Sequence, residues 1–168
     1  MSPNRLLRLA RRLAEGAHGT RPGRPDSVEL QRAVSTIYYA LFHSLARCVA
    51  DTLVAKTRAA RSQSAWVQAY RAVNHGNVKK QCMKQSPIKL FPSEIQDFAR
   101  LFVDMQYNRE EADYHPMASF SRAQVIQWVQ RAEYAISQFD QVANKDRQAF
   151  AVYVTLPFRS SQPPKVRV

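Results

Sequence analysis

Residues 27–56 constrain the fold of this chain more than any other stretch. Their apolar side chains recur in steps of three and four, at Val34, Ile37, Tyr38, Leu41, Leu45, Val49 and Leu53. This spacing places them along one side of an α-helix. Asp26 or Ser27 can cap the helix, and Glu29 in the first turn suits the positive end of the helix dipole. The stretch is therefore predicted to form one long amphipathic helix.

The rest of the sequence up to residue 149 repeats this pattern in shorter segments. We expect helices over about residues 3–15, 62–74, 93–115 and 119–139, with a short turn or helix over 77–83. Gly76 is placed to end the third helix and Pro116 to end the fourth, and glycines and prolines at 16–25 predict a loop after the first. The predicted fold class is all-α, a five-helix antiparallel up-and-down bundle forming a single domain over residues 1–149.

The two ends of the chain allow more than one interpretation. Residues 1–25 hold six arginines and one acid, Glu15, which is typical of a mitochondrial presequence, but Leu6, Leu9 and Leu13 favour an opening helix that packs on the domain. Residues 150–168 combine a β-prone run at 152–156 with prolines and scattered basic residues. They predict a C-terminal extended tail, which could fold over the bundle, pair with another chain or stay loose.

The charge of the chain indicates its class of partner. The 168 residues carry 25 Lys and Arg against 13 Asp and Glu, a net charge of +12, so a polyanion is the first partner to expect. The 45% of apolar residues suffices for a hydrophobic core. The longest nearly uninterrupted apolar run, residues 37–42, is far shorter than the roughly 20 residues of a membrane-spanning helix. We therefore predict no membrane association.

The two cysteines, Cys48 and Cys82, argue against a disulfide framework and against a zinc site. They lack CxxC or Cys/His ligand spacing, and two cysteines cannot build such a framework in a chain of this length. A reducing compartment fits best, and we predict a cytoplasmic protein. We expect no metal ion and no cofactor.

Positive charge is concentrated in the middle of the chain, because residues 52–93 contain no acid. Within this segment we predict that Arg71, Lys79, Lys80 and Lys84 bind nucleic acid. Trp66, Tyr70 and His75 are interleaved with them and could stack on single-stranded bases. The alternatives are that the two larger rings belong to the core of the third helix, that His75 lies at the surface or caps a helix end, and that the lysines form a solvated face.

The segment from Arg109 to His115 holds the residues best suited to chemistry. A histidine that titrates near neutral pH can take the proton of a ribose 2′-hydroxyl or supply one to a leaving 5′-oxygen. A guanidinium can hold the phosphate and stabilise the charge of the transition state. The alternatives are that Arg109 pairs with Asp113, four residues later on the same helix face, and that His115 caps the helix end.

Two segments together resemble the HEPN superfamily of small helical domains. The second helix contains the run Ser35-Thr36-Ile37-Tyr38-Tyr39-Ala40-Leu41-Phe42-His43, and the fourth contains Arg109-x-x-Ala112-Asp113-Tyr114. The family's ribonuclease motif is an arginine, a polar residue, and a histidine four to six residues after the arginine, which Arg109, Glu110 and His115 match. The resemblance covers about residues 27–140. Many toxins of this superfamily carry a tyrosine two residues after the histidine, where this chain has Met117.

The resemblance implies a homodimer in which two Arg109/His115 pairs share one cleft, and Asp113, Tyr114, Tyr39 and His43 are predicted to support them. His43 could instead be a core or interface residue. Such proteins are often toxins or defence nucleases encoded beside a nucleotidyltransferase antitoxin. We therefore predict a metal-independent endoribonuclease acting on RNA. One alternative is a non-catalytic module of the same fold that binds RNA, a nucleotide or a partner nucleotidyltransferase, and another is an interaction protein whose basic face meets an acidic partner.

Overall fold

The computed structural model describes residues 2–16 and 25–156, and most of these residues are helical. Within these residues there are eight α-helices and one short 3-10 helix. In chain order they are α1 (Pro3–Ala14), α2 (Ser27–Leu53), η1 (Arg58–Ala60), α3 (Gln63–Arg71), α4 (His75–Cys82), α5 (Gln85–Ile88), α6 (Ser93–Tyr114), α7 (Arg122–Gln141) and α8 (Asn144–Thr155).

Several helices begin at residues that favour a helix start. The predicted cap of α2 is confirmed as a capping box: the Asp26 carboxylate accepts from the Glu29 backbone N–H at 2.7 Å, and the Glu29 carboxylate accepts from the Asp26 N–H at 3.0 Å. Pro3 opens α1, where its fixed φ suits the first turn. Ser121 accepts from the Gln124 N–H at the start of α7. Local sequence therefore sets the beginnings of the longest elements.

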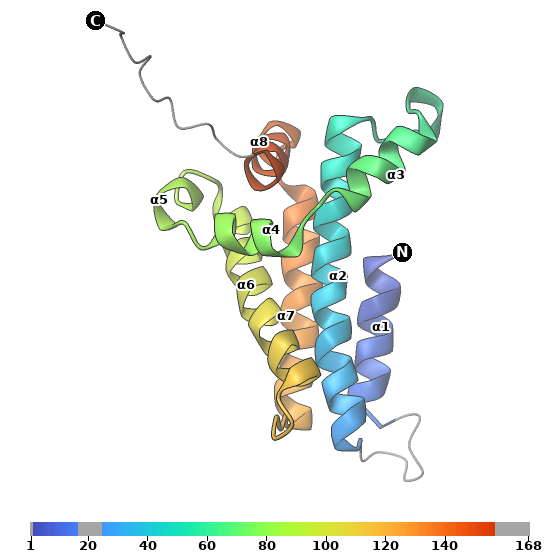
Figure 1. Ribbon diagram of the computed structural model, residues 1–168, viewed down its shortest axis with the longest axis vertical. Coiled ribbons are helices and arrows are strands. Elements are labelled where there is room, and N and C mark those ends of the chain that lie inside the picture. Colours follow the sequence, from blue (N-terminus) through green and yellow to red (C-terminus); the bar gives the residue numbers. More distant parts are fainter. Residues whose placement is uncertain (1, 17–24, 157–168) are drawn as a thin grey trace, which may run out of the picture.

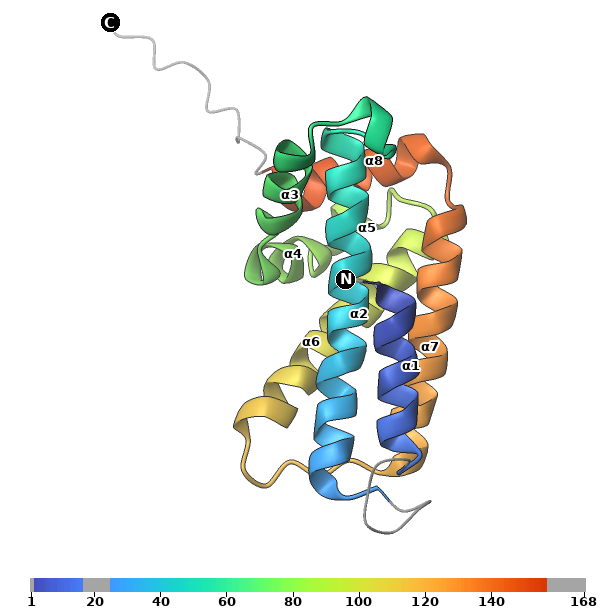
Figure 2. The same ribbon diagram turned by 90° about the vertical axis from the view of Figure 1, so that its right-hand side faces the viewer.

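Four helices, α1, α2, α6 and α7, run alternately up and down and form the body of the molecule (Figure 1). The helix α2 is central, because it packs against α1, α3, α6, α7 and α8. Fully buried rings fill the space between these helices, among them Phe98 and Phe139, whose centroids lie 4.4 Å apart. The short helices α3, α4 and α5 follow one another between α2 and α6 at one end of the body, and α8 lies across the same end (Figures 1 and 2).

The predicted all-helical class is confirmed, and the count of helices differs from the prediction. Where five helices were expected the described residues hold eight, because the stretch between α2 and α6 forms three short helices and α8 follows α7. Gly76 does not end the third helix. It lies in the first turn of α4, which Asn74 caps by accepting from the Asn77 N–H at 3.0 Å.

The structure also corrects the start of the C-terminal tail. Residues 150–155 belong to α8 instead of extending from residue 150, and four of them, Phe150, Ala151, Tyr153 and Val154, pack in the core. Phe150 is fully buried against Phe91 and Phe139, with ring centroids 5.5 and 6.0 Å away. The run at 152–156 has β-branched and aromatic residues, but Phe150, Ala151 and Val154 share one helical face, and their burial overrides the strand propensity. The rest of the predicted tail, 157–168, lies outside the described residues.

The N-terminal segment forms the helix that one interpretation of the sequence favoured. It packs on α2 and α7, and its fully buried positions are Leu7, Ala10 and Ala14, while Leu6 and Leu13 are partly buried at the edge of the core. The loop predicted after it lies mostly at 17–24, outside the described residues. Among the helices of the described ranges, none combines the length and the apolar character that crossing a membrane requires.

Candidate functional site

The face of α2 that turns toward α3, α4 and α6 carries four rings, Tyr38, Tyr39, Phe42 and His43, which we call the aromatic stripe. Their spacing of three and four residues places them on one side of the helix. Tyr38 and Phe42 are buried, whereas Tyr39 and His43 are half-buried. Of the predicted site residues on other helices, Arg109 contacts this stripe.

Arg109 of α6 lies against the aromatic stripe and is fixed by several contacts. Its Nε lies 2.6 Å from Asp113 Oδ2, and its Nη2 donates to the Tyr39 hydroxyl at 3.3 Å. The guanidinium carbon lies 5.8 Å from the centre of the Tyr39 ring and 5.5 Å from that of Tyr114, within reach of cation–π attraction. The ion pair with Asp113 that the sequence spacing allowed is present. Arg109 is therefore held in one orientation from both sides.

Asp113 connects α6 to α2 as well as to Arg109. Its Oδ1 accepts from the Ser35 hydroxyl at 2.6 Å, and Ser35 is buried on α2. Ser35 is four residues before Tyr39, so the two groups lie one helical turn apart on α2. The carboxylate thus joins the two helices at the point where Arg109 meets the aromatic stripe.

His115 lies directly after α6 and is exposed. Its backbone N–H donates to the carbonyl of Glu111, while its side chain takes part in no hydrogen bond, ion pair or ring contact within residues 2–16 and 25–156. The imidazole therefore neither caps the helix nor touches Arg109, and it is open to solvent.

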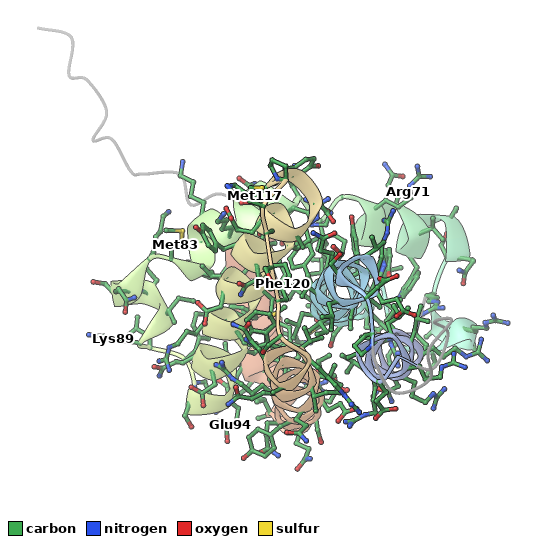
Figure 3. All side chains as sticks on the ribbon, turned by 90° about the horizontal axis from the view of Figure 1, so that it is seen from below. Arg71, Met83, Lys89, Glu94, Met117 and Phe120 are labelled. Carbon is green, nitrogen blue, oxygen red and sulfur yellow. The ribbon has the colours of Figure 1, made fainter. Side chains whose placement is uncertain are left out.

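Figure 3, which views the molecule from below, places Met117 near the edge of the molecule and Phe120 further in, where its ring packs on Trp128 at 5.9 Å.

Two histidines lie at the aromatic stripe: His43 is one of its four rings, and His75 packs on it from α4. His43 Nδ1 lies 2.5 Å from the Tyr70 hydroxyl of α3, and the two rings are stacked. His75, the first residue of α4, stacks on Phe42 with centroids 3.7 Å apart, and its Nδ1 lies 2.5 Å from the Tyr38 hydroxyl. Burial lowers the pKa of both histidines, and for His75 the positive charge of Arg109 lowers it further. Both environments therefore disfavour the charged imidazolium.

The sequence did not predict that His75 belongs to this cluster. It placed His75 at the end of the third helix, whereas the residue begins α4 and packs on α2, 33 to 37 positions earlier in the chain. Trp66 and Tyr70 of α3 are half-buried, so neither lies within the core. Trp66 Nε1 donates to Asp51 at 2.8 Å, and its ring stacks on Tyr70. No local pattern signals these contacts, because each joins elements that only the tertiary fold brings together.

The predicted nucleic-acid-binding residues are distributed over α3, α4 and the start of α5. Lys79 is partly neutralised as a phosphate-binding group, because its ammonium pairs with the Glu110 carboxylate at 3.1 Å. The same carboxylate also accepts from Gln106 at 3.2 Å. These hydrogen bonds outweigh partial burial and lower the pKa of Glu110. Arg71, Lys80 and Lys84 are exposed, and their side chains make no ion pair within the described ranges.

These basic residues share one side of the molecule with Arg109. Figure 2 shows α3, α4 and the last turns of α6 projecting on one side of the four long helices, with α1 and α7 on the other. They are spread over three short helices, with Arg71 at the end of α3, Lys80 in α4 and Lys84 at the start of α5. The arrangement is a broad basic arc that extends along α3 and α4 above the end of α6.

The sequence matches no known family model and no curated protein, and the structure matches no solved structure.

Proposed function

We propose that the protein is a metal-independent endoribonuclease of the HEPN type. The proposal is carried by two side chains near the end of α6. Asp113 and Tyr39 hold Arg109 through its Nε and Nη2, which leaves Nη1 out of these contacts. The His115 imidazole is exposed and makes no hydrogen bond, ion pair or ring contact with the other described residues. A fixed guanidinium and an accessible imidazole are the groups that cleavage at a 2′-hydroxyl requires.

The chemistry follows from those two groups. A neutral His115 imidazole accepts the proton of a ribose 2′-hydroxyl, and the oxygen attacks the adjacent phosphorus. The new bond to the 2′-oxygen forms as the bond to the 5′-oxygen breaks, which leaves a 2′,3′-cyclic phosphate and a 5′-hydroxyl. Arg109 binds the phosphate and stabilises the negative charge that builds up on it. In the homodimer that belongs to this proposal, the His115 imidazolium of the second copy supplies the proton to the leaving oxygen.

The charge and the surroundings of Arg109 support this assignment. Although burial opposes it, the nearby Tyr39 and Asp113 raise the pKa of Arg109, so the guanidinium stays charged throughout the physiological range. Arg71 and Lys80, on the same side of the molecule, can bind phosphates further along a strand. The substrate we propose is single-stranded RNA, in a reducing, cytoplasmic setting, with toxin or defence activity as the biological context.

One observation favours a second candidate, a non-catalytic module of the same fold. Asp113 already pairs with Arg109 at 2.6 Å and so neutralises part of the charge that a phosphate would meet. In that case the basic arc binds RNA, a nucleotide or a partner nucleotidyltransferase without cutting RNA. The two candidates differ in whether His115 has any role.

The test is cleavage of a labelled single-stranded RNA by the purified protein in excess EDTA, with detection of 2′,3′-cyclic phosphate ends. We expect His115→Ala to abolish cleavage and Arg109→Gln to reduce it by at least about a hundredfold, the scale of removing one stabilising group from a transition state. Arg100→Gln is the matched control, because Arg100 lies on the same helix with its side chain 69% exposed. Its rate should equal that of the wild type.

Three results would change the conclusion. Cleavage that survives His115→Ala removes this residue from the mechanism. Salt-dependent RNA binding without any cleavage by the wild type favours the binding module. Failure to bind RNA at low salt excludes the nuclease and the RNA-binding form of the second candidate, and failure to bind any nucleic acid points to an acidic protein partner.

A further inference from the structure

A polar cavity lies away from the aromatic stripe, between the start of α1, the second half of α2, the end of α7 and the start of α8. Its volume is about 710 Å³. Because α1 begins at Pro3, part of the way along α2 and α7, those two helices continue beyond it toward α8 (Figure 2). The cavity occupies this uncovered part of the body. It has the size of the sites that take small organic ligands.

Three basic side chains from two parts of the chain line this cavity: Arg47 and Lys56, from α2 and the segment after it, and Arg147 from α8. None of the three lies within 4.0 Å of an acidic side chain in residues 2–16 and 25–156. The Nε of Arg147 is shielded from solvent and has no hydrogen-bond partner there. A buried donor without an acceptor is costly, so the structure gives up a hydrogen bond at Arg147.

Two carboxylates also line the cavity, and they do not cancel its positive charge. Asp51 is already engaged, since it accepts from Trp66 Nε1 at 2.8 Å and pairs with Arg61 at 3.5 Å. Asp140 is the other acid, and burial raises its pKa although Arg47, Arg147 and Lys56 act electrostatically to lower it. These three cations thus surround one carboxylate without pairing with it. The cavity keeps an excess of positive charge.

The backbone adds to this field, because two helices begin at the cavity. Ser2 and Asn144, at the starts of α1 and α8, both line it. Each helix is 12 residues long, and neither has a side-chain hydrogen bond at its N-cap, Ser2 or Ala143. Helix starts carry partial positive charge and N–H groups that donate to no acceptor within the helix. They reinforce the arginines in attracting an anion.

We propose that this cavity binds the oligophosphate group of a small ligand, either a nucleoside triphosphate or an inorganic triphosphate. Three unpaired cations and two helix starts in one cavity match several negative oxygens close together, and an arginine fork suits phosphate geometry. The cavity is lined by residues of α1, α2, α7 and α8 and of the segment after α2, whereas α3, α4 and the last turns of α6 project on the side away from α1 and α7 (Figure 2). The site is therefore separate from the one proposed to cut RNA and does not depend on it.

The experiment is calorimetric titration of the purified protein with sodium triphosphate, ATP and adenosine at fixed ionic strength. We expect triphosphate and ATP to bind and adenosine not to bind. The double variant Arg47→Ala/Arg147→Ala should weaken both affinities by at least about tenfold per arginine, because charge-assisted hydrogen bonds to phosphate are lost. The matched control is Arg8→Ala/Arg12→Ala, which removes the same charge from exposed positions of α1 and should leave the affinity within about twofold.

A second variant tests the same site in the opposite direction. Asp140→Asn removes the carboxylate that the three cations surround, so it should tighten triphosphate binding. Equal affinity for triphosphate and ATP would show that the phosphate chain alone is recognised, and tighter binding of ATP would add a contact to the nucleoside.

Two kinds of result overturn the proposal. The first is no heat of binding with triphosphate or ATP, or an affinity that falls equally in the cavity variant and in the α1 control. The second is single-stranded RNA that binds with the same dependence on Arg47 and Arg147, which would assign these residues to a polymer. Circular dichroism of each variant confirms that the helices are intact.

Discussion

Replacing Asp113 by alanine tests how the site is held together. Asp113 accepts from the hydroxyl of Ser35, which is 7% exposed, and pairs with Arg109 through side chains that are 24% and 23% exposed respectively. The substitution removes both contacts at once and leaves the Ser35 hydroxyl facing a space without an acceptor. It should therefore destabilise the fold, in addition to any effect on activity.

The size of the effect follows from the burial of the groups. A buried hydroxyl that loses its charged acceptor costs about 2 kcal/mol. The ion pair is partly exposed and adds about 0.5 to 1 kcal/mol. Alanine has a better helix propensity than aspartate by about 0.5 kcal/mol, and removing a carboxylate from the last turn of a helix returns about 0.5 kcal/mol. The expected net loss is about 1.5 to 2 kcal/mol.

Urea unfolding followed by circular dichroism at pH 7 measures this loss. Asp113→Asn retains an oxygen that accepts from Ser35 and should lose only about 0.5 to 1 kcal/mol, the share of the ion pair. Asp104→Ala, on an exposed position of the same helix, is the control and should change the free energy of unfolding by less than about 0.5 kcal/mol. If Asp113→Ala matches the wild type to within that margin, the reasoning about Ser35 and Arg109 is wrong.

Three further perturbations test other parts of the structure. Phe150→Ala should lower the free energy of unfolding by about 3 to 5 kcal/mol, because the ring is fully buried. Val152→Ala, on the exposed face of α8, should lower it by less than about 1 kcal/mol. Equal effects of the two variants in urea unfolding would contradict the packing of α8. The pKa of His75 is lowered in the folded state, so the unfolded chain takes up the proton first and stability is lost as the pH falls below about 6.5. His75→Gln should flatten that loss between pH 7.5 and 5.5, and an unchanged slope would exclude His75 as its source. Burial raises the pKa of Cys48 to about 11 and of Cys82 to about 12, so iodoacetamide at pH 8 should alkylate both slowly in buffer and rapidly in urea, as mass spectrometry would reveal.

The long helices could be predicted from sequence because their signals are local. Apolar residues at helical spacing, Asp26 with Glu29, and Pro116 each act within a few residues, and the structure has α2 and α6 where these signals place them. The helix α8 escaped prediction because its last turns contain Val152, Tyr153 and Val154, which favour strands when considered alone. Their environment is decided by burial, which is a property of the whole fold.

The same distinction applies to the candidate site. The pair of Arg109 with Asp113 follows from a spacing of four on one helix, so the sequence could suggest it. The contact of Arg109 with Tyr39 spans 70 positions and that of Ser35 with Asp113 spans 78, and no local rule supplies either of them. Grouping Tyr39, His43 and Arg109 was possible only through the family resemblance, and His75 was missed because its partners lie on another helix.

The attachment of α3 has a consequence for access to the aromatic stripe. None of the residues 63–71 is buried, and α3 is fastened to α2 mainly by two polar hydrogen bonds, Trp66 to Asp51 and Tyr70 to His43. Separating it from α2 uncovers no fully buried side chain of α3, so its amides should exchange with solvent through local opening at a free energy below that of global unfolding. Each opening uncovers His43, one helical turn from the tyrosine that holds Arg109, while the four long helices stay assembled. How often a large ligand finds that part of α2 uncovered is therefore set by two side-chain contacts.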